Sequence, residues 1–165
     1  MARRLELSRK FDYRNFVMFN FDFYGVLLYY AYTINQDSAF LLFKATQSEY
    51  NYKLGYELPI DDSTSDKEVF ISIDLFSEVV DFINDLIIPS LENLPYDQDI
   101  TQIWGVGSSL DTFLQCKGAF FLKFIVDDIQ INDYSIGTLI DKYNQISIFI
   151  AEAYDDNEKY NVVIE

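Results

Sequence analysis

Histidine is absent from this chain of 165 residues, and cysteine occurs once. Without histidine the chain lacks the commonest general base, and Ser-His-Asp triads, Cys-His dyads and histidine-containing zinc sites are excluded. The single Cys116 cannot form a disulfide within the chain, which favours a reducing compartment, and a thiol with no histidine indicates an inert buried side chain. Catalysis is therefore disfavoured, and we expect a protein that is not an enzyme and holds no cofactor.

Arginine is missing after Arg14, so the charge of the chain is unevenly distributed. The first 14 residues carry five basic and two acidic side chains, whereas the rest of the chain carries seven lysines and 25 carboxylates. A surface with a formal net charge of −15 repels nucleic acid and anionic membranes and attracts basic protein surfaces. We expect a basic protein as the partner, with no direct binding to nucleic acid or membrane.

Long uninterrupted apolar runs are also lacking. The apolar stretch 16–34 follows a basic N-terminus, but Asn20 and Asp22 interrupt it, which suits neither a signal peptide nor a transmembrane helix. We expect a cytoplasmic protein. Half of the residues are apolar and 18% are aromatic, so the acidity belongs to a folded body. The length predicts one acidic domain over residues 15–165, preceded by residues 1–14 as a basic arm or first strand.

Hydrophobic patterning, punctuated by only six glycines and three prolines, predicts both strands and helices. The predicted strands are residues 16–23, 26–34, 39–46, 50–58, 68–74, 119–126, 146–153 and 160–164, with a helix as the alternative for 24–34. The predicted helices are residues 75–88, 108–118 and 135–144, with a short helical turn near 99–104. Hairpin-like groups of strands with helices between them predict an α+β fold, a mainly antiparallel sheet with two to four helices packed on one face.

The best-patterned segment is the predicted helix 75–88, which Asp74 is expected to cap and Pro89 to end. Four carboxylates, spaced i, i+4, i+7 and i+11, line its polar face and are named here the acidic stripe: Asp74, Glu78, Asp81 and Asp85. At a rise of about 1.5 Å per residue, they recur about every 5–6 Å, so they can stand in for a nucleic-acid backbone. Solubility alone also explains a polar face. A soluble face usually mixes signs, however, and no Lys or Arg occurs from residue 68 to residue 116.

Other acidic clusters fall in predicted loops and turns. Asp61, Asp62 and Asp66 lie in the loop 60–67, which we add to the predicted partner-binding set. Calcium loops are not matched, because Lys159 stands where a ligand belongs in the run from Asp155, and we expect no metal site. The glycine-containing loop 105–107 lacks the lysine of a phosphate loop and is interpreted as a helix-capping loop.

Tyrosine is concentrated between residues 11 and 56. Such residues are enriched at interfaces because they bury a large area with little loss of rotamer entropy. We expect most of them in the core and a subset as apolar anchors for a partner. The tyrosines concerned are Tyr24, Tyr29, Tyr30, Tyr32, Tyr50, Tyr52 and Tyr56.

In composition the chain resembles the immunity proteins and antitoxins that bacteria use against basic nuclease toxins. That resemblance implies a carboxylate-rich face that covers the positively charged active-site cleft of the toxin, with association steered by charge. A phage-type nucleic-acid mimic that inhibits a host defence enzyme is an alternative. A structural or assembly subunit, held through its basic N-terminal arm, is the alternative from another class.

Overall fold

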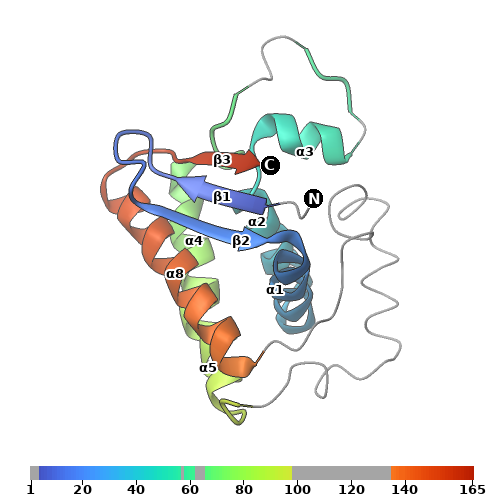
Figure 1. Cartoon of the computed structure of the whole chain (residues 1–165), viewed down its shortest axis with the longest axis vertical. Coiled ribbons are helices and arrows are strands. Elements are labelled where there is room, and N and C mark those ends of the chain that lie inside the picture. The colour runs from blue at the N-terminus through green and yellow to red at the C-terminus, as the bar shows by residue number, and fades with distance from the viewer. Residues whose placement is uncertain (1–3, 57, 62–65, 98–134) are drawn as a thin grey trace.

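The computed structural model describes residues 4–56, 58–61, 66–97 and 135–165. Its sheet has three antiparallel strands, in which β1 (Arg4–Ser8) lies between β2 (Phe16–Asn20) and β3 (Asn161–Ile164) (Figure 1). The segment predicted as a basic arm or first strand therefore supplies the middle strand. Cys116 and the elements predicted between residues 99 and 126 lie outside the described residues.

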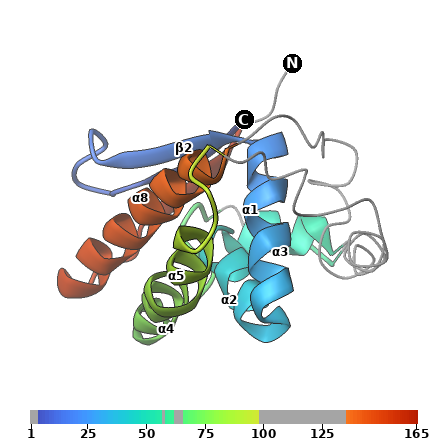
Figure 2. The ribbon, with the colours of Figure 1, turned by 90° about the horizontal axis from the view of Figure 1, so that it is seen from below.

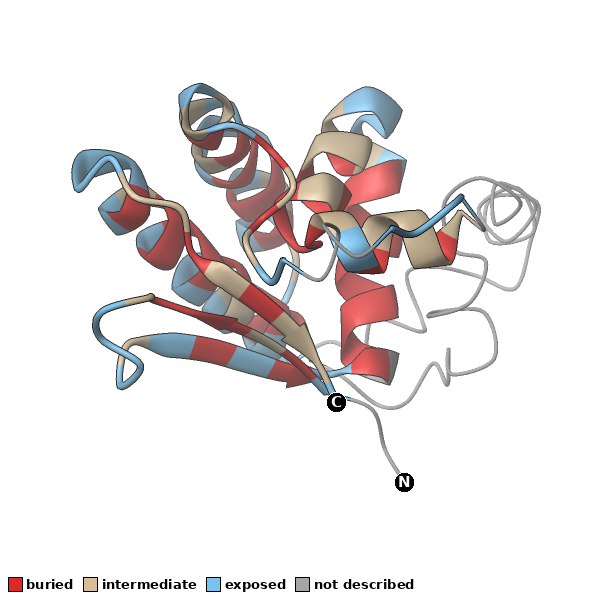
Figure 3. Ribbon diagram, turned by 90° about the horizontal axis from the view of Figure 1, so that it is seen from above, coloured by how far each residue is buried: buried red, intermediate tan, exposed pale blue. Residues whose placement is uncertain are grey.

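One face of the sheet is buried and the other is exposed. Leu5 and Leu7 of β1 pair with Phe19 and Val17 of β2, and all four side chains are buried. Along β2 burial alternates with exposure, as Figure 3 shows, which is the pattern of a sheet covered on one side. The strand predicted at 16–23 is confirmed only as far as Asn20, and β3 confirms the strand predicted at 160–164.

Helix α1 (Phe21–Ile34) corrects the strand predicted at 26–34 in favour of its helical alternative. Its apolar residues are buried on almost every side of the helix, which is red throughout most of its length in Figure 3. A helix that is covered all round has no polar face, so its sequence shows no period of 3.6. Its run of apolar residues is therefore indistinguishable from that of a buried strand.

Two further predicted strands, 39–46 and 50–58, are helices: α2 (Gln36–Ala45) and α3 (Glu49–Gly55). Both begin at capping side chains. The Asn35 side chain accepts a hydrogen bond from Ser38 N at 2.9 Å, and the Ser48 hydroxyl accepts one from Asn51 N at 3.2 Å. Asn and Ser, which also favour turns, thus start helices here, because their side chains satisfy the free N–H groups of a first turn.

Residues 68–74 do not form the predicted strand. Within the described range 66–97, Glu68 and Val69 make isolated bridges, to Asn161 and Ser48 respectively. The alternating apolar residues Val69 and Ile71 are nevertheless buried. The alternation therefore belongs to a segment that packs against the core without forming a continuous strand.

The predicted helix 75–88 is confirmed but continues further. It begins with a 3₁₀ turn, η2 (Ile73–Leu75), and proceeds as α4 (Phe76–Asp81), a π-helical segment η3 (Phe82–Ile87) and α5 (Ile88–Glu92). Asp74 makes no capping hydrogen bond, and Pro89 does not end the helix. The wider i→i+5 turn precedes Pro89, which then occupies the first turn of α5, where a missing N–H is tolerated.

Helix α8 (Ile136–Asp155) confirms the helix predicted at 135–144 and replaces the strand predicted at 146–153. Ser135 caps it by accepting a hydrogen bond from Thr138 N at 3.2 Å. The run Ile146–Ile150 is rich in β-branched residues, which favours a strand locally. Packing overrides that preference, because Ile146, Ile150 and Ala153 continue the buried stripe of a single helix.

The helices form a layer beneath the sheet. Viewed from below in Figure 2, α8 lies beside α4 and α5, which lie next to α2 and then α1. Tyr160 ties the C-terminal strand to α2 by donating a hydrogen bond to the Ala45 carbonyl at 2.5 Å, and Tyr143 of α8 donates one to the Leu27 carbonyl of α1. The α+β class with an antiparallel sheet is confirmed. Among the described helices, none is long and apolar enough to cross a bilayer.

Candidate protein-binding surface

All four carboxylates of the acidic stripe are exposed. They project from the helix that runs from η2 through η3, opposite the buried Phe76, Val79 and Ile83. Amphipathicity explains the arrangement: the apolar residues pack against α8 and α2, so the acidic residues face water. The structure thus places the stripe on the surface, in agreement with its helical spacing.

The π-helical segment changes the geometry of the stripe at its C-terminal end. Its i→i+5 hydrogen bonds place more residues in each turn than an α-helix has, so Asp85 is rotated about the axis relative to Asp81. The same rotation explains Leu86, which regular spacing assigns to the buried face but which is 50% exposed, while Ile87 and Ile88 are buried. The regular carboxylate repeat therefore holds through Asp81 and not beyond.

The structure describes two of the three loop residues that were predicted to join the stripe. Asp61 is exposed, Asp62 lies outside the described residues, and Asp66 accepts a hydrogen bond from Glu68 N at 2.8 Å. Asp66 lines a pocket of about 370 Å³ together with Asn51 of α3 and Ile164 of β3. This pocket is formed by α3 and the edge of the sheet.

Two of the five N-terminal bases form ion pairs within the described chain. Arg9 Nη2 lies 2.7 Å from Asp156 Oδ2 and 3.2 Å from Glu158 Oε2, and Lys10 pairs with Glu68. Part of the positive charge of the N-terminal segment is therefore neutralised by carboxylates of the same chain. Burial lowers the pKa of Arg9, but the hydrogen bonds with Asp156 and Glu158 outweigh it and raise the pKa overall, so the guanidinium stays charged.

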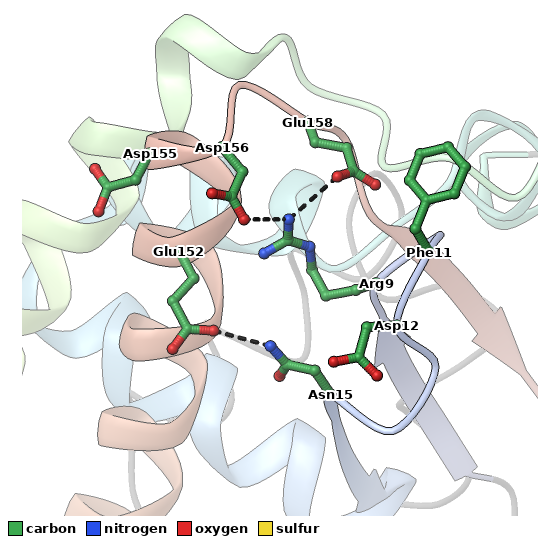
Figure 4. A pocket seen from close by; sticks show the side chains of 8 residues that line it. All are labelled: Arg9, Phe11, Asp12, Asn15, Glu152, Asp155, Asp156 and Glu158. Carbon is green, nitrogen blue, oxygen red and sulfur yellow. Dashed lines mark hydrogen bonds and ion pairs between the residues drawn. The ribbon is translucent and has the colours of Figure 1, made fainter.

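A pocket that the sequence analysis did not identify surrounds Arg9, where the β1–β2 hairpin meets the end of α8 (Figure 4). It has a volume of about 390 Å³ and is named here the Arg9 pocket. Asn15 Nδ2 donates a hydrogen bond to Glu152 Oε2 at 2.9 Å, which holds the hairpin against α8. The lining residues are Arg9, Phe11, Asp12, Asn15, Glu152, Asp155, Asp156 and Glu158.

Large apolar side chains are exposed beside this pocket. Phe11 is 87% and Tyr13 is 79% exposed at the tip of the hairpin, and Ile148 of α8 is 59% exposed. Phe16 and Ile148 line a second pocket, of about 560 Å³, which shares Asp12, Asn15 and Glu152 with the Arg9 pocket. The two pockets thus form one groove between hairpin and helix, and it is named here the hairpin–α8 groove.

Most of the seven tyrosines lie in the core, as expected. Tyr24, Tyr29, Tyr30 and Tyr32 are buried on α1, Tyr52 and Tyr56 are half-buried, and only Tyr50 among the seven is exposed. The two most exposed aromatic residues, Phe11 and Tyr13, lie instead in the segment that joins β1 to β2.

No family model, no curated protein and no solved structure matches this chain. Among the described residues, no three His, Cys, Asp or Glu side chains are arranged to hold a metal ion.

Proposed function

We propose that this chain binds a basic protein through its carboxylate surface and inhibits it by covering a positively charged cleft. A basic nuclease toxin is the partner that the composition favours, as for an immunity protein or antitoxin. A host defence enzyme, inhibited by a nucleic-acid mimic, presents the same kind of cleft. Both partners would meet the same charge pattern, and identification of the captured protein separates them.

The observation that supports this proposal is the exposed acidic stripe on a helix that carries no basic residue. Asp141 and Asp155 of the neighbouring α8 are exposed as well. The two helices are held together by their apolar faces and by a hydrogen bond of 2.8 Å from Ser147 Oγ to Asn84 Oδ1. Carboxylates fixed on two packed helices present a preformed negative field, which steers a basic partner and loses little entropy on binding.

The experiment is capture of a partner from lysate at low and high salt, with the purified full chain as bait. Neutralising the acidic stripe should weaken capture by at least about tenfold, and high salt should do the same. A matched control removes four exposed carboxylates elsewhere and should leave capture nearly unchanged. The stripe variant is D74N/E78Q/D81N/D85N, and the control is D37N/E49Q/D97N/E165Q.

Equal capture by the two variants would contradict the proposal, since net charge alone would then account for binding. The assembly alternative needs its own variant. Deleting residues 1–14 would remove the middle strand of the sheet, so neutralising the exposed Arg4 and Arg14 is the cleaner test. Loss of capture in R4Q/R14Q, with the stripe variant unaffected, would favour assembly through the basic segment.

A further inference from the structure

Two buried polar atoms in the Arg9 pocket have no hydrogen-bond partner. The Arg9 side chain is only 8% exposed, and its Nη2 is shared between two carboxylates while its buried Nε has no acceptor. Oε1 of Glu158 is buried without a donor. In Figure 4 this unbonded oxygen lies on the side of the carboxylate nearer Phe11. Buried polar groups are almost always hydrogen-bonded, so two unbonded atoms set this corner apart, although neither atom is open to the pocket.

The charge of the pocket selects among ligands. Five carboxylates and one guanidinium line it, so a cation is attracted and a free anion is repelled. The exposed carboxylates Glu152 and Asp155 can pair with the basic side chain of a peptide, and the exposed apolar side chains of Phe16 and Ile148 can contact its neighbouring residues. The excess of carboxylates next to this apolar surface thus indicates a peptide segment that carries a basic residue.

The rest of the groove adds apolar contacts. Phe11 lies beside the pocket with its ring exposed, where a guanidinium or ammonium group can lie over its face. Phe16 and Ile148 continue the groove with exposed apolar surface. Exposed aromatic residues with a polar, charged rim are typical of protein-binding sites, in which aromatic residues anchor the partner.

We propose that the hairpin–α8 groove binds a basic segment of a protein partner, with an Arg or Lys side chain in the Arg9 pocket and an adjacent apolar side chain against Phe16 and Ile148. The partner is of the same class as in the proposed function, on which this inference rests. The groove would supply a specific anchor, whereas the acidic stripe supplies long-range attraction.

The probe is the capped peptide acetyl-Leu-Arg-Leu-amide, titrated into the ¹⁵N-labelled full chain and followed by amide chemical shifts. We expect saturable shifts centred on Arg9, Asn15, Glu152 and Glu158, with a dissociation constant on the order of 1 mM, the scale of a small ligand with one ion pair. The control peptide carries citrulline, which has the shape of arginine without its charge, and should bind at least about tenfold more weakly. Equal binding of the two peptides, or shifts spread over the acidic stripe, would overturn the inference.

Variants on exposed residues avoid the risk that a change at Arg9 unfolds the hairpin. D155N and F11A remove a rim carboxylate and the exposed ring, and each should weaken the arginine peptide at least about threefold. D37N, which makes the same charge change on α2, should leave peptide affinity unchanged. Unaltered affinity in both D155N and F11A would overturn the proposed groove.

The two proposals fail separately. Peptide titration measures the groove alone, and salt-dependent capture from lysate measures the proposed function alone. If the stripe variant loses the captured partner while D155N and F11A retain it fully, the inference is overturned and the proposed function stands. If the peptide binds as expected but no basic protein is captured, the groove stands and the proposed function fails.

Discussion

The acidic stripe and the α8–β3 corner, residues 152–160, contain the same kind of side chain in different surroundings. The stripe carboxylates face water along one helix, with no basic residue on that helix. At the corner, Asp156 and Glu158 share a buried arginine from the start of the chain, and Tyr160 follows directly in the core. Acidic residues therefore occupy two environments here. Those on the stripe are surrounded by water, whereas Asp156 and Glu158 hold the hairpin in place by pairing with Arg9.

The largest expected effect comes from removing the buried cation of the corner. Arg9→Met should lower the free energy of unfolding by about 2–3 kcal/mol, because Glu158 would remain partly buried without its partner. This loss is smaller than that for a fully buried ion pair, because the Asp156 side chain is 62% exposed and is hydrated when Arg9 is removed. Urea unfolding measures it. Arg14→Met, at an exposed arginine of the same hairpin, is the matched control and should change stability by less than about 0.5 kcal/mol.

A stability loss for Arg9→Met no larger than that of its control would remove the distinction between the two regions. The corner would then be a surface ion pair like many others.

Alkaline pH should act on the corner through Tyr160. Burial, followed by the nearby Tyr24, raises the pKa of Tyr160 well above its ordinary value, so the folded state keeps the proton that the unfolded state loses above about pH 10. The contribution is complete below pH 10 and declines as pH rises toward the folded pKa. Above about pH 10, Tyr160 alone should make the free energy of unfolding fall by up to about 1.4 kcal/mol more per pH unit.

Urea unfolding between pH 9 and 11 measures this slope in the unmodified chain and in Tyr160→Phe. The variant loses the hydrogen bond to Ala45 and is less stable at pH 9, but its stability should fall less steeply above pH 10. Parallel pH profiles would contradict the assignment.

The smallest effect is expected on the stripe. Asp81→Asn removes a like charge next to Glu78, so it should raise stability by about 0.2–0.5 kcal/mol at low salt, with the gain disappearing at high salt. Asp37→Asn makes the same change in the first turn of α2, where a negative charge favours the helix, and should lower stability slightly. Urea unfolding measures both changes in stability. If the two variants changed stability in the same direction, net charge and not the position of the carboxylate would determine the effect.

The sequence predicted elements well where one face of an element is exposed. β2, the start of α8 and the helix after residue 75 each combine buried and exposed positions, which produces a recognisable period. Prediction was wrong where packing covers the whole element, as in α1, or where β-branched residues lie on a buried helix face, as in the second half of α8. The starts of α2 and α3 could have been predicted from Asn35 and Ser48, because polar residues of this kind start helices as well as turns.

Of the candidate surface, the acidic stripe was predictable from the sequence and the Arg9 pocket was not. The stripe follows from spacing within one helix, and all four of its residues are exposed as expected, although the π-helical segment rotates Asp85 away from the regular repeat. The Arg9 pocket joins residues more than 140 positions apart, and no local pattern connects them.

By itself, therefore, the sequence determined the sign and the imbalance of the charge, the α+β class and the helix that carries the acidic stripe, because these depend on composition and on short-range periodicity. Only the tertiary structure decided that the basic first segment becomes the middle strand and that Arg9 is buried against Asp156 and Glu158. It also decided which aromatic residues remain in water. The physical reason is that burial depends on every element that packs against a residue, and a sequence lists only the neighbours along the chain.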